Sequence, residues 1–434
     1  MTKPSCRDRL EQALTRIADP NGEGTRACLT VYAEGARAAA DAADTRTVRG
    51  VSLGPLDGDI VTIKDLFDVA GEATRAGSKI LAEEAAPAIA DAPVVQRLRA
   101  AGAVIVAKTN MTEFAFSGIG ANPHFGTPGN PRDRARVPGG SSSGAAVAVA
   151  DGMCDIAIGT DTGGSVRVPA ALCGLVGFKP SRQRLPTEGA FPLSKTLDSI
   201  GPIARTIADC AKADAVMAGE SFTPLEPIAL AGRSFGIAEG LPLDRLDETV
   251  ASAFAAAIAR LDGAGVRVTR ETLPLFDDMV AVNAKGGISP PEACAIHRDR
   301  MRRRAGDIDP NVRARIERGC AVTEADYAGM MRERERLVRA MAERLATLDA
   351  LLMPTTSIAA PTIAEVEDRK VFAARNAAVL RNTSIVNFFD LCAISLPLPT
   401  APTTMPVGLM LVARNGQDRR LLRIAAAAMQ LFGA

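Results

Sequence analysis

Histidine is scarce in this sequence: only His124 and His297 occur among 434 residues, and tryptophan is absent. Histidine is the side chain that most often moves protons near neutral pH. A Ser-His-Asp triad could use either residue, but neither stands in a context that indicates catalysis, so we expect both to be structural or solvated. A zinc site takes three or four ligands at short spacings. No such cluster of His, Cys or carboxylate residues occurs, so the sequence predicts no metal site.

Several other patterns are missing, and each absence excludes a class of protein. The eight cysteines never form a C-x-x-C pair, so we expect free, mostly buried thiols. No run of 18 uncharged apolar residues occurs, and the first residues lack the apolar segment of a secretion signal. The formal net charge of +1 creates no field that favours nucleic acid. We therefore expect a cytoplasmic protein that binds neither membrane nor nucleic acid.

Strand and helix patterns alternate along the whole chain. The periodicity predicts helices over 6–18, 27–43 and 205–218, and buried strands that end near Lys64 and Lys108. The second half continues with short apolar strands and a set of helices rich in Arg and Glu over 290–347. This alternation predicts an α/β fold in which a large mixed central β-sheet is covered by helices on both faces. We expect one domain over 1–434, with 275–345 as a helical elaboration over one end of the sheet.

Two stretches rich in glycine and serine stand out against this background. The first is "PGGSSSGAAVAVADG" (138–152), where one of three serines is expected to cap the following helix. The second is "GTDTGGSVRVPAALCG" (159–174), where glycines could gather backbone N–H groups into a pocket for an anion. A tight turn explains the second stretch equally well when it is taken alone. Neither G-x-G-x-x-G nor G-x-x-x-x-G-K-[ST] occurs, so no phosphate or dinucleotide loop is predicted.

A serine nucleophile needs a base, and lysine is the next candidate after histidine. Lys64 ends the apolar run "IVTIK", where burial lowers an amine's pKa by desolvating the charged form. Lys108 and Lys179 also adjoin apolar runs and are rivals. From the residues alone, a solvated lysine at a strand end remains an alternative.

Together these segments resemble the amidase signature family. The resemblance is carried by "TIKDLFDVAG", "AKTNMTEFAF", "PGGSSSGAAVAVA", "GTDTGGSVRVPAALCGLVGFKPS" and "LDSIGPIART", in this order. These motifs cover most of the stretch from 58 to 207, which we call the signature core. "DLCAISLP" and "PVGLMLVA" near the C-terminus match more weakly. Several long motifs in fixed order are far more specific than a single glycine pattern.

The resemblance implies a Ser-Ser-Lys triad and no cofactor. Ser165 matches the nucleophile that becomes an acyl-enzyme, Lys64 matches the general base, and Ser141 matches the serine that bridges them. In the family this bridging serine follows a cis peptide bond, so the bond between Gly140 and Ser141 is expected to be cis. The oxyanion is expected on the backbone N–H groups of Thr162, Gly163, Gly164 and Ser165. Supporting roles fall to Ser142, Asp161 and Arg167.

The substrate implied by the resemblance is a small-molecule carboxylic amide (aliphatic, aryl or half-amide), hydrolysed to a carboxylate and ammonia or an amine. The alternative is the glutaminase (A-type) subunit of a tRNA-dependent amidotransferase, which needs partner subunits. Phe116, His124 and Phe125 are expected in the pocket wall, together with part of 275–345. The basic stretch 297–306 fits a solvated helix face better than a site for a carboxylate or RNA. A homodimer is common in such enzymes, but no interface signature is visible.

Overall fold

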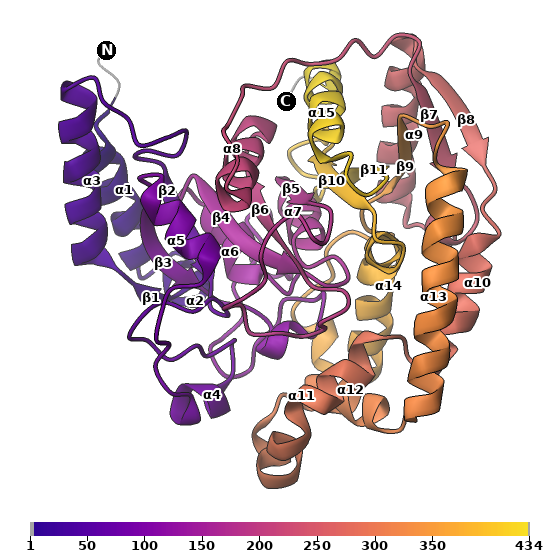
Figure 1. Cartoon of the computed structure of the whole chain (residues 1–434), viewed down its shortest axis with the longest axis horizontal. Helices are drawn as coiled ribbons and strands as arrows, with labels where there is room; N and C mark the ends of the chain where they lie inside the picture. Colours follow the sequence, from indigo (N-terminus) through magenta and orange to yellow (C-terminus); the bar gives the residue numbers. More distant parts are fainter. Residues whose placement is uncertain (1–3, 433–434) are drawn as a thin grey trace.

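A single eleven-stranded mixed sheet organises the molecule in the computed structural model, which describes residues 4–432. The strand order is β1-β3-β2-β4-β6-β5-β10-β11-β9-β7-β8. The six strands of the first half of the chain therefore lie together, and β5 meets the second half at β10. The sheet runs across the molecule from the N-terminal helices to β8 (Figure 1). This is the α/β architecture that the alternating pattern predicted.

Each strand is short, and most are completely buried. The bounds are β1 Cys28–Val31, β2 Ile60–Lys64, β3 Val104–Thr109, β4 Ile156–Asp161, β5 Val176–Lys179, β6 Ser199–Ala204, β7 Ser234–Ala238, β8 Arg267–Glu271, β9 Ala350–Pro354, β10 Cys392–Pro397 and β11 Gly408–Ala413. β2 lies between β3 and β4 and is parallel to both. Parallel strands buried on both faces are expected to be continuous apolar runs, as "IVTIK" and "VIVAKT" are.

Helices cover both faces of the sheet. Their bounds are α1 Cys6–Ala18, α2 Gly24–Ala27, α3 Ala33–Val48, α4 Lys79–Glu84, α5 Pro93–Ala100, α6 Ser143–Ala150, α7 Arg167–Cys173, α8 Ile207–Ala218, α9 Glu248–Gly263, α10 Leu275–Val282, α11 Ser289–Arg304, α12 Pro310–Cys320, α13 Glu324–Arg344, α14 Arg369–Phe388 and α15 Asp418–Phe432. One core unites apolar side chains of α5, α8, α9 and α15 on one face. A second core contains apolar side chains of α1, α3, α6 and α7. The remaining cores contain those of α10, α13 and α14.

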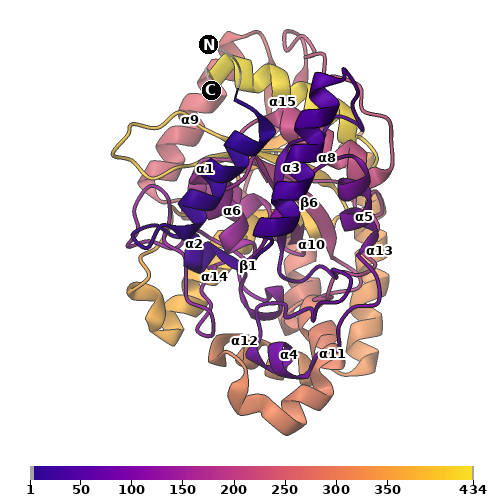
Figure 2. The ribbon, with the colours of Figure 1, turned by 90° about the vertical axis from the view of Figure 1, so that its left-hand side faces the viewer.

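Helices α11 and α12 lie beyond the ends of the strands, at the bottom of the view in Figure 1, and next to α4 (Figure 2). Ion pairs from Arg303 and Arg304 to Glu84 join α11 to α4. The arginine-rich stretch thus contacts acidic side chains of the protein itself. Among residues 4–432, no helix combines the length and the apolar character that crossing a membrane requires.

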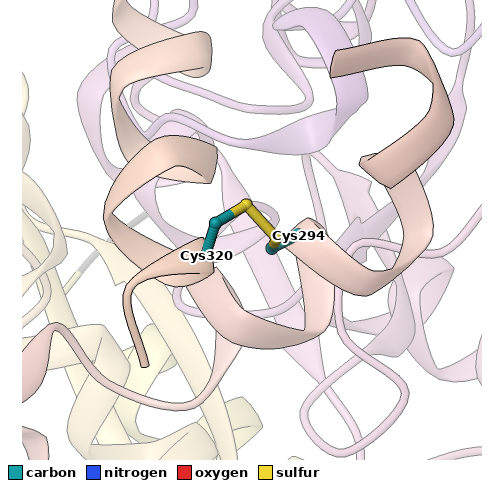
Figure 3. The surroundings of a disulfide bond; sticks show 2 residues. All are labelled: Cys294 and Cys320. Carbon is teal, nitrogen blue, oxygen red and sulfur yellow. A yellow bond between two sulfur atoms is a disulfide. The ribbon is translucent and has the colours of Figure 1, made fainter. Parts of the chain in front are cut away.

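Two local expectations were wrong, and one helix was missed. Residues 28–31 form the edge strand β1, and the helix predicted over 27–43 begins at Ala33. Helix α14 was not anticipated. Cys294 and Cys320 form a disulfide between α11 and α12 (Figure 3), although free thiols were expected; the other six cysteines are free and buried, as predicted.

Candidate active site

Lys64 stands at the end of β2, inside the protein, with no exposed surface. Its Nζ lies 2.7 Å from Ser141 Oγ and 3.0 Å from Thr160 Oγ1, a residue of the neighbouring strand β4. Because β2 and β4 are parallel, their carboxyl ends meet at the same edge of the sheet. Burial lowers the pKa of Lys64 to about 7, although the charges of Asp198 and Asp161 partly oppose the shift. A substantial fraction of this amine is therefore neutral near pH 7.

The two rival lysines have other partners. Lys179 donates from Nζ to the carbonyl oxygens of Pro180 and Leu391, at 2.7 and 2.9 Å. Lys108 Nζ lies 3.3 Å from a carboxylate oxygen of Glu72. Of the three lysines, Lys64 is the one that contacts a serine of the glycine–serine stretches.

The first glycine–serine stretch packs tightly at this point. The Gly140–Ser141 peptide bond is cis, as the resemblance implied. A side chain at Gly140 would place its Cβ 2.7 Å from the backbone of Gly120, so no larger residue fits. Ser142 occupies the N-cap position of α6, but its side chain makes no capping bond. Its Oγ instead lies 3.5 Å from the carbonyl oxygen of Thr160.

A buried ion pair shapes the second glycine–serine stretch. Arg167 donates to both carboxylate oxygens of Asp161, at 2.7 and 3.0 Å, and both side chains are fully buried. Burial would raise the pKa of Asp161, but the charge and hydrogen bonds of Arg167 outweigh it and lower the pKa to about 2. Asn387 of α14 completes the arrangement by donating to Asp161 and accepting from Arg167. Asp161 is therefore ionised at neutral pH, and its carboxylate anchors the loop.

This anchored loop carries Ser165. The backbone N–H of Ser142 donates to the carbonyl oxygen of Ser165 at 3.3 Å, which joins the two glycine–serine stretches. Gly164 has a φ of +136°, and a Cβ there would lie 2.1 Å from Thr383 Oγ1. Its N–H donates to Asp161 Oδ1 at 2.9 Å. Of the four N–H groups expected to hold an oxyanion, that of Gly164 is therefore engaged with the carboxylate.

Asp198 is a second buried carboxylate beside the loop. It accepts a hydrogen bond of 2.5 Å from Thr162 Oγ1 and two more from the N–H groups of Leu193 and Ser194. Burial raises its pKa to about 6, with these hydrogen bonds opposing the rise. Its charge is the largest influence that raises the pKa of Lys64, so the two groups are coupled electrostatically.

The three residues that were expected in the pocket wall, Phe116, His124 and Phe125, each contact a different charged side chain. Phe116 is buried beneath the guanidinium of Arg315. His124 Nε2 lies 3.1 Å from a carboxylate oxygen of Glu113, and Phe125 lies beside Arg75. The backbone N–H groups of His124 and Phe125 both donate to one side-chain oxygen, that of Asn122, so these two residues form a local turn.

A cleft of about 670 Å³ is lined by residues 195–196 and by helices α11, α12 and α13. Thr196 stands on its wall, two residues before Asp198, and Glu292 faces it from α11. Both members of the disulfide also line it. The predicted helical elaboration therefore forms one side of a cleft whose other side adjoins the Asp198 segment.

Several contributors to the site were not predicted from the sequence. Lys64 Nζ donates to Thr160 as well as to Ser141, and Asp198 accepts from Thr162. Thr383 donates to the carbonyl oxygen of Gly163 at 2.6 Å. Asn387 lies more than 200 residues from its partners. Thr160 and Asp198 stand inside motifs already singled out, but no pattern in the sequence marks the two residues of α14.

Comparisons with known proteins identify the family of this chain. The chain is 37% identical to 2-amino-5-chloromuconic acid deaminase of Comamonas testosteroni, over 92% of this chain and 87% of that one. It is 36% identical to the A-type subunit of glutamyl-tRNA(Gln) amidotransferase from Acidothermus cellulolyticus, over 95% and 88%. A crystal structure of an amidase superposes with a TM-score of 0.87 at 35% identity, covering 98% of this chain and 96% of the other. The sequence model of the Amidase family matches residues 8–422. The chain belongs to the amidase signature family and is a hydrolase of amide C–N bonds.

Proposed function

We propose that this protein hydrolyses a small carboxylic amide through an acyl-enzyme on Ser165, with Lys64 as general base and Ser141 as the bridge between them. The observation that carries the proposal is the buried hydrogen bond of 2.7 Å between Lys64 Nζ and Ser141 Oγ. A neutral amine in this position accepts the proton of Ser141, which accepts that of Ser165 as Ser165 attacks the carbonyl carbon. The same relay returns the proton to the leaving amine, and water then releases the acid.

The oxyanion of the tetrahedral intermediate fits the backbone of the loop that Asp161 anchors. Because the Gly164 N–H already donates to Asp161, the N–H groups of Thr162, Gly163 and Ser165 are the donors that we assign to it. Donors that are fixed before the reaction stabilise developing charge at no cost of reorganisation. The Arg167–Asp161 pair and Asn387 supply this fixation. Ser142 supports the loop through its hydrogen bond to the carbonyl of Ser165.

A second candidate function is the glutaminase component of a tRNA-dependent amidotransferase. The likeness to the A-type subunit of such an enzyme supports it, at 36% identity over 95% of this chain. The chemistry at Ser165 is the same in both candidates. They differ in the amide that is cleaved and in the need for partner subunits.

Ammonia release by the purified chain tests the proposal. The panel contains acetamide, benzamide, malonamate, indole-3-acetamide, glutamine and a dipeptide amide. We expect release from at least one free amide in the absence of any other protein. Activity that requires added subunits, with glutamine as the amide, would favour the second candidate.

Ser165→Ala is the decisive control, with Ser143→Ala as its match. Ser143 is buried in the first glycine–serine stretch, two residues after Ser141, and its Oγ has no hydrogen-bond partner among residues 4–432. We expect Ser165→Ala to lower kcat by at least about 10³-fold while the fold is retained. Normal turnover by Ser165→Ala would exclude this serine as the nucleophile.

A further inference from the structure

Glu292 lies in the first turn of α11, and its carboxylate accepts four hydrogen bonds. One oxygen, Oε2, accepts from the hydroxyl of Ser194 and from the N–H of Thr196, the latter at 3.2 Å. The other oxygen accepts from the hydroxyl of Thr196 and, at 2.6 Å, from that of Tyr327 on α13. A carboxylate has about four acceptor positions, so Glu292 is fully occupied. It fastens the turn that precedes β6 to two helices of the second half of the chain.

Ser194 connects Glu292 to Asp198. Its side chain is completely buried, and its hydroxyl donates to Glu292 and accepts from the N–H of Leu197 at 3.2 Å. Its backbone N–H donates to the carboxylate of Asp198 at 3.0 Å, and its carbonyl oxygen accepts from the N–H of Asp198 at 2.9 Å. Three contacts thus fix the two residues relative to each other, and a shift of Ser194 displaces Asp198.

Asp198 and its neighbour Ser199 hold the loop that carries Ser165. Asp198 accepts from Thr162 Oγ1 at 2.5 Å, and Ser199 donates from Oγ to the carbonyl oxygen of Asp161 at 2.9 Å. The backbone N–H of Thr162 is one of the donors that we assign to the oxyanion. A continuous series of hydrogen bonds therefore joins Glu292 to the proposed oxyanion site.

We propose that Glu292 is a positioning residue for the oxyanion donors: it fixes Ser194, which fixes Asp198, which fixes Thr162. This inference rests on the proposed function and gives α11 a part in the rate of the reaction. None of the four hydrogen bonds of Glu292 reaches a residue of the proposed relay, so it acts only through the loop. Oxyanion donors stabilise the transition state more than the bound amide. A displaced Thr162 therefore lowers kcat and leaves KM almost unchanged.

Substitution of Glu292 tests this separation of kcat from KM on the amide of the panel that is hydrolysed fastest. Glu292→Leu is similar in size and accepts no hydrogen bond, so we expect kcat to fall by at least about 10-fold while KM stays within about threefold. Glu292→Gln should retain most of kcat, because its amide group can donate to the hydroxyls that its oxygen does not bind. A Gln variant as slow as the Leu variant would assign the effect to charge and overturn the positioning role.

Glu324→Leu is the matched control, since Glu324 lines the same cleft from α13 and is exposed. Both of its kinetic constants should equal those of wild type. Thr162→Val tests the route, because it removes the hydroxyl that Asp198 holds. With that contact gone, Glu292→Leu should lower kcat little further, so that the two effects are strongly non-additive. Additive effects would contradict a route through Thr162.

Amide hydrogen exchange gives a readout independent of turnover. Mass spectrometry follows peptides that cover 159–167 and 191–199, and we expect faster exchange in both for Glu292→Leu and wild-type exchange for Glu324→Leu. Unchanged kcat together with unchanged exchange at 159–167 would overturn the inference and leave the amidase proposal standing. Faster exchange at 159–167 in a protein that hydrolyses no amide would support the role of Glu292 and count against the proposed function.

Discussion

Single residues decide the chemistry of this site through burial. Lys64 lies in a completely enclosed position, and desolvation brings its pKa to about 7. Lys179 is equally buried, and burial lowers its pKa to about 8, but backbone carbonyls occupy its hydrogen bonds. A lowered pKa therefore does not by itself mark a base. The serine partner distinguishes the two lysines, and only the folded chain brings that partner to Lys64.

Ser141→Ala tests the proton relay at the scale of one oxygen atom. Removing this hydroxyl disconnects Lys64 from Ser165, so we expect kcat/KM to fall by at least about 10²-fold. Ser143→Ala should stay within about threefold of wild type, because its hydroxyl is unpartnered among residues 4–432. The initial rate of ammonia release measures both. Equal effects of the two substitutions would contradict a specific role for Ser141.

The pH profile follows from the protonation of Lys64. The base acts in its neutral form, so kcat/KM should be constant above the pKa of about 7 and fall tenfold per pH unit below it. Asp198→Asn removes the charge that most raises this pKa. The variant's acid limb should therefore move to lower pH. A limb that stays in place or moves upward would show that another group controls the profile.

At the scale of elements, α14 is the main feature that the sequence did not predict. It spans Arg369–Phe388, and Asn376, Asn382, Thr383 and Asn387 are buried among its apolar residues. Polar residues on the inner face obscure the apolar stripe by which a helix is detected. Thr383 and Asn387 bond the loop of Ser165. Asn376 accepts from the N–H of Gly118, and Asn382 donates to the carbonyl oxygens of Pro242 and Pro354. The buried polar residues that obscure the helix in the sequence thus include those that contact the proposed site.

The contact between α14 and the loop of Ser165 can be tested with adjacent glycines. Gly164→Ala would place a methyl group 2.1 Å from Thr383 Oγ1, at a φ of +136° that alanine disfavours. We expect it to abolish activity and to lower the free energy of unfolding by more than about 1 kcal/mol. Gly163→Ala meets nothing closer than 3.9 Å and should destabilise much less. Thermal unfolding and ammonia release distinguish the two variants; comparable losses of stability would contradict this packing.

For the rest of the elements, local pattern was a good guide. The apolar runs that became β2, β3, β4, β10 and β11 needed no tertiary information. β1 is four residues long and lies at the sheet edge, where the pattern is too short to separate strand from helix. The Cys294–Cys320 pairing escaped prediction because 26 residues separate the two cysteines, and spacing does not determine which thiols meet.

At the scale of the whole molecule, the chain forms two contiguous halves of one sheet. β1 to β6 lie on one side of the β5–β10 junction, and β7 to β9 and β11 lie with β10 on the other. The first half contains Lys64, Ser141 and Ser165, which is why its motifs alone revealed the family. The second half supplies Thr383 and Asn387, so the signature core does not complete the site by itself.

Dividing the chain between α8 and β7 tests this dependence. Residues 221–230 contain neither helix nor strand, so fragments 1–225 and 226–434 keep every element whole. We expect fragment 1–225 alone to be inactive and prone to aggregate, because β5 becomes an exposed edge. Co-expression of both fragments should restore ammonia release, and size-exclusion chromatography should show one complex. Full activity of fragment 1–225 alone would show that α14 is dispensable.

The position of the disulfide-linked pair α11 and α12 also bears on how the substrate range of such an enzyme could evolve. It lies between β8 and β9 in the chain, and Arg315 of α12 contacts Phe116 of the signature core. It contributes none of the three residues of the proposed relay. Mutations there therefore leave the three residues of the proposed relay unchanged. Because this segment lines the cleft beside residues 195–196, we expect a graft of residues 289–320 from a relative to change the range of amides hydrolysed while the proposed relay stays intact.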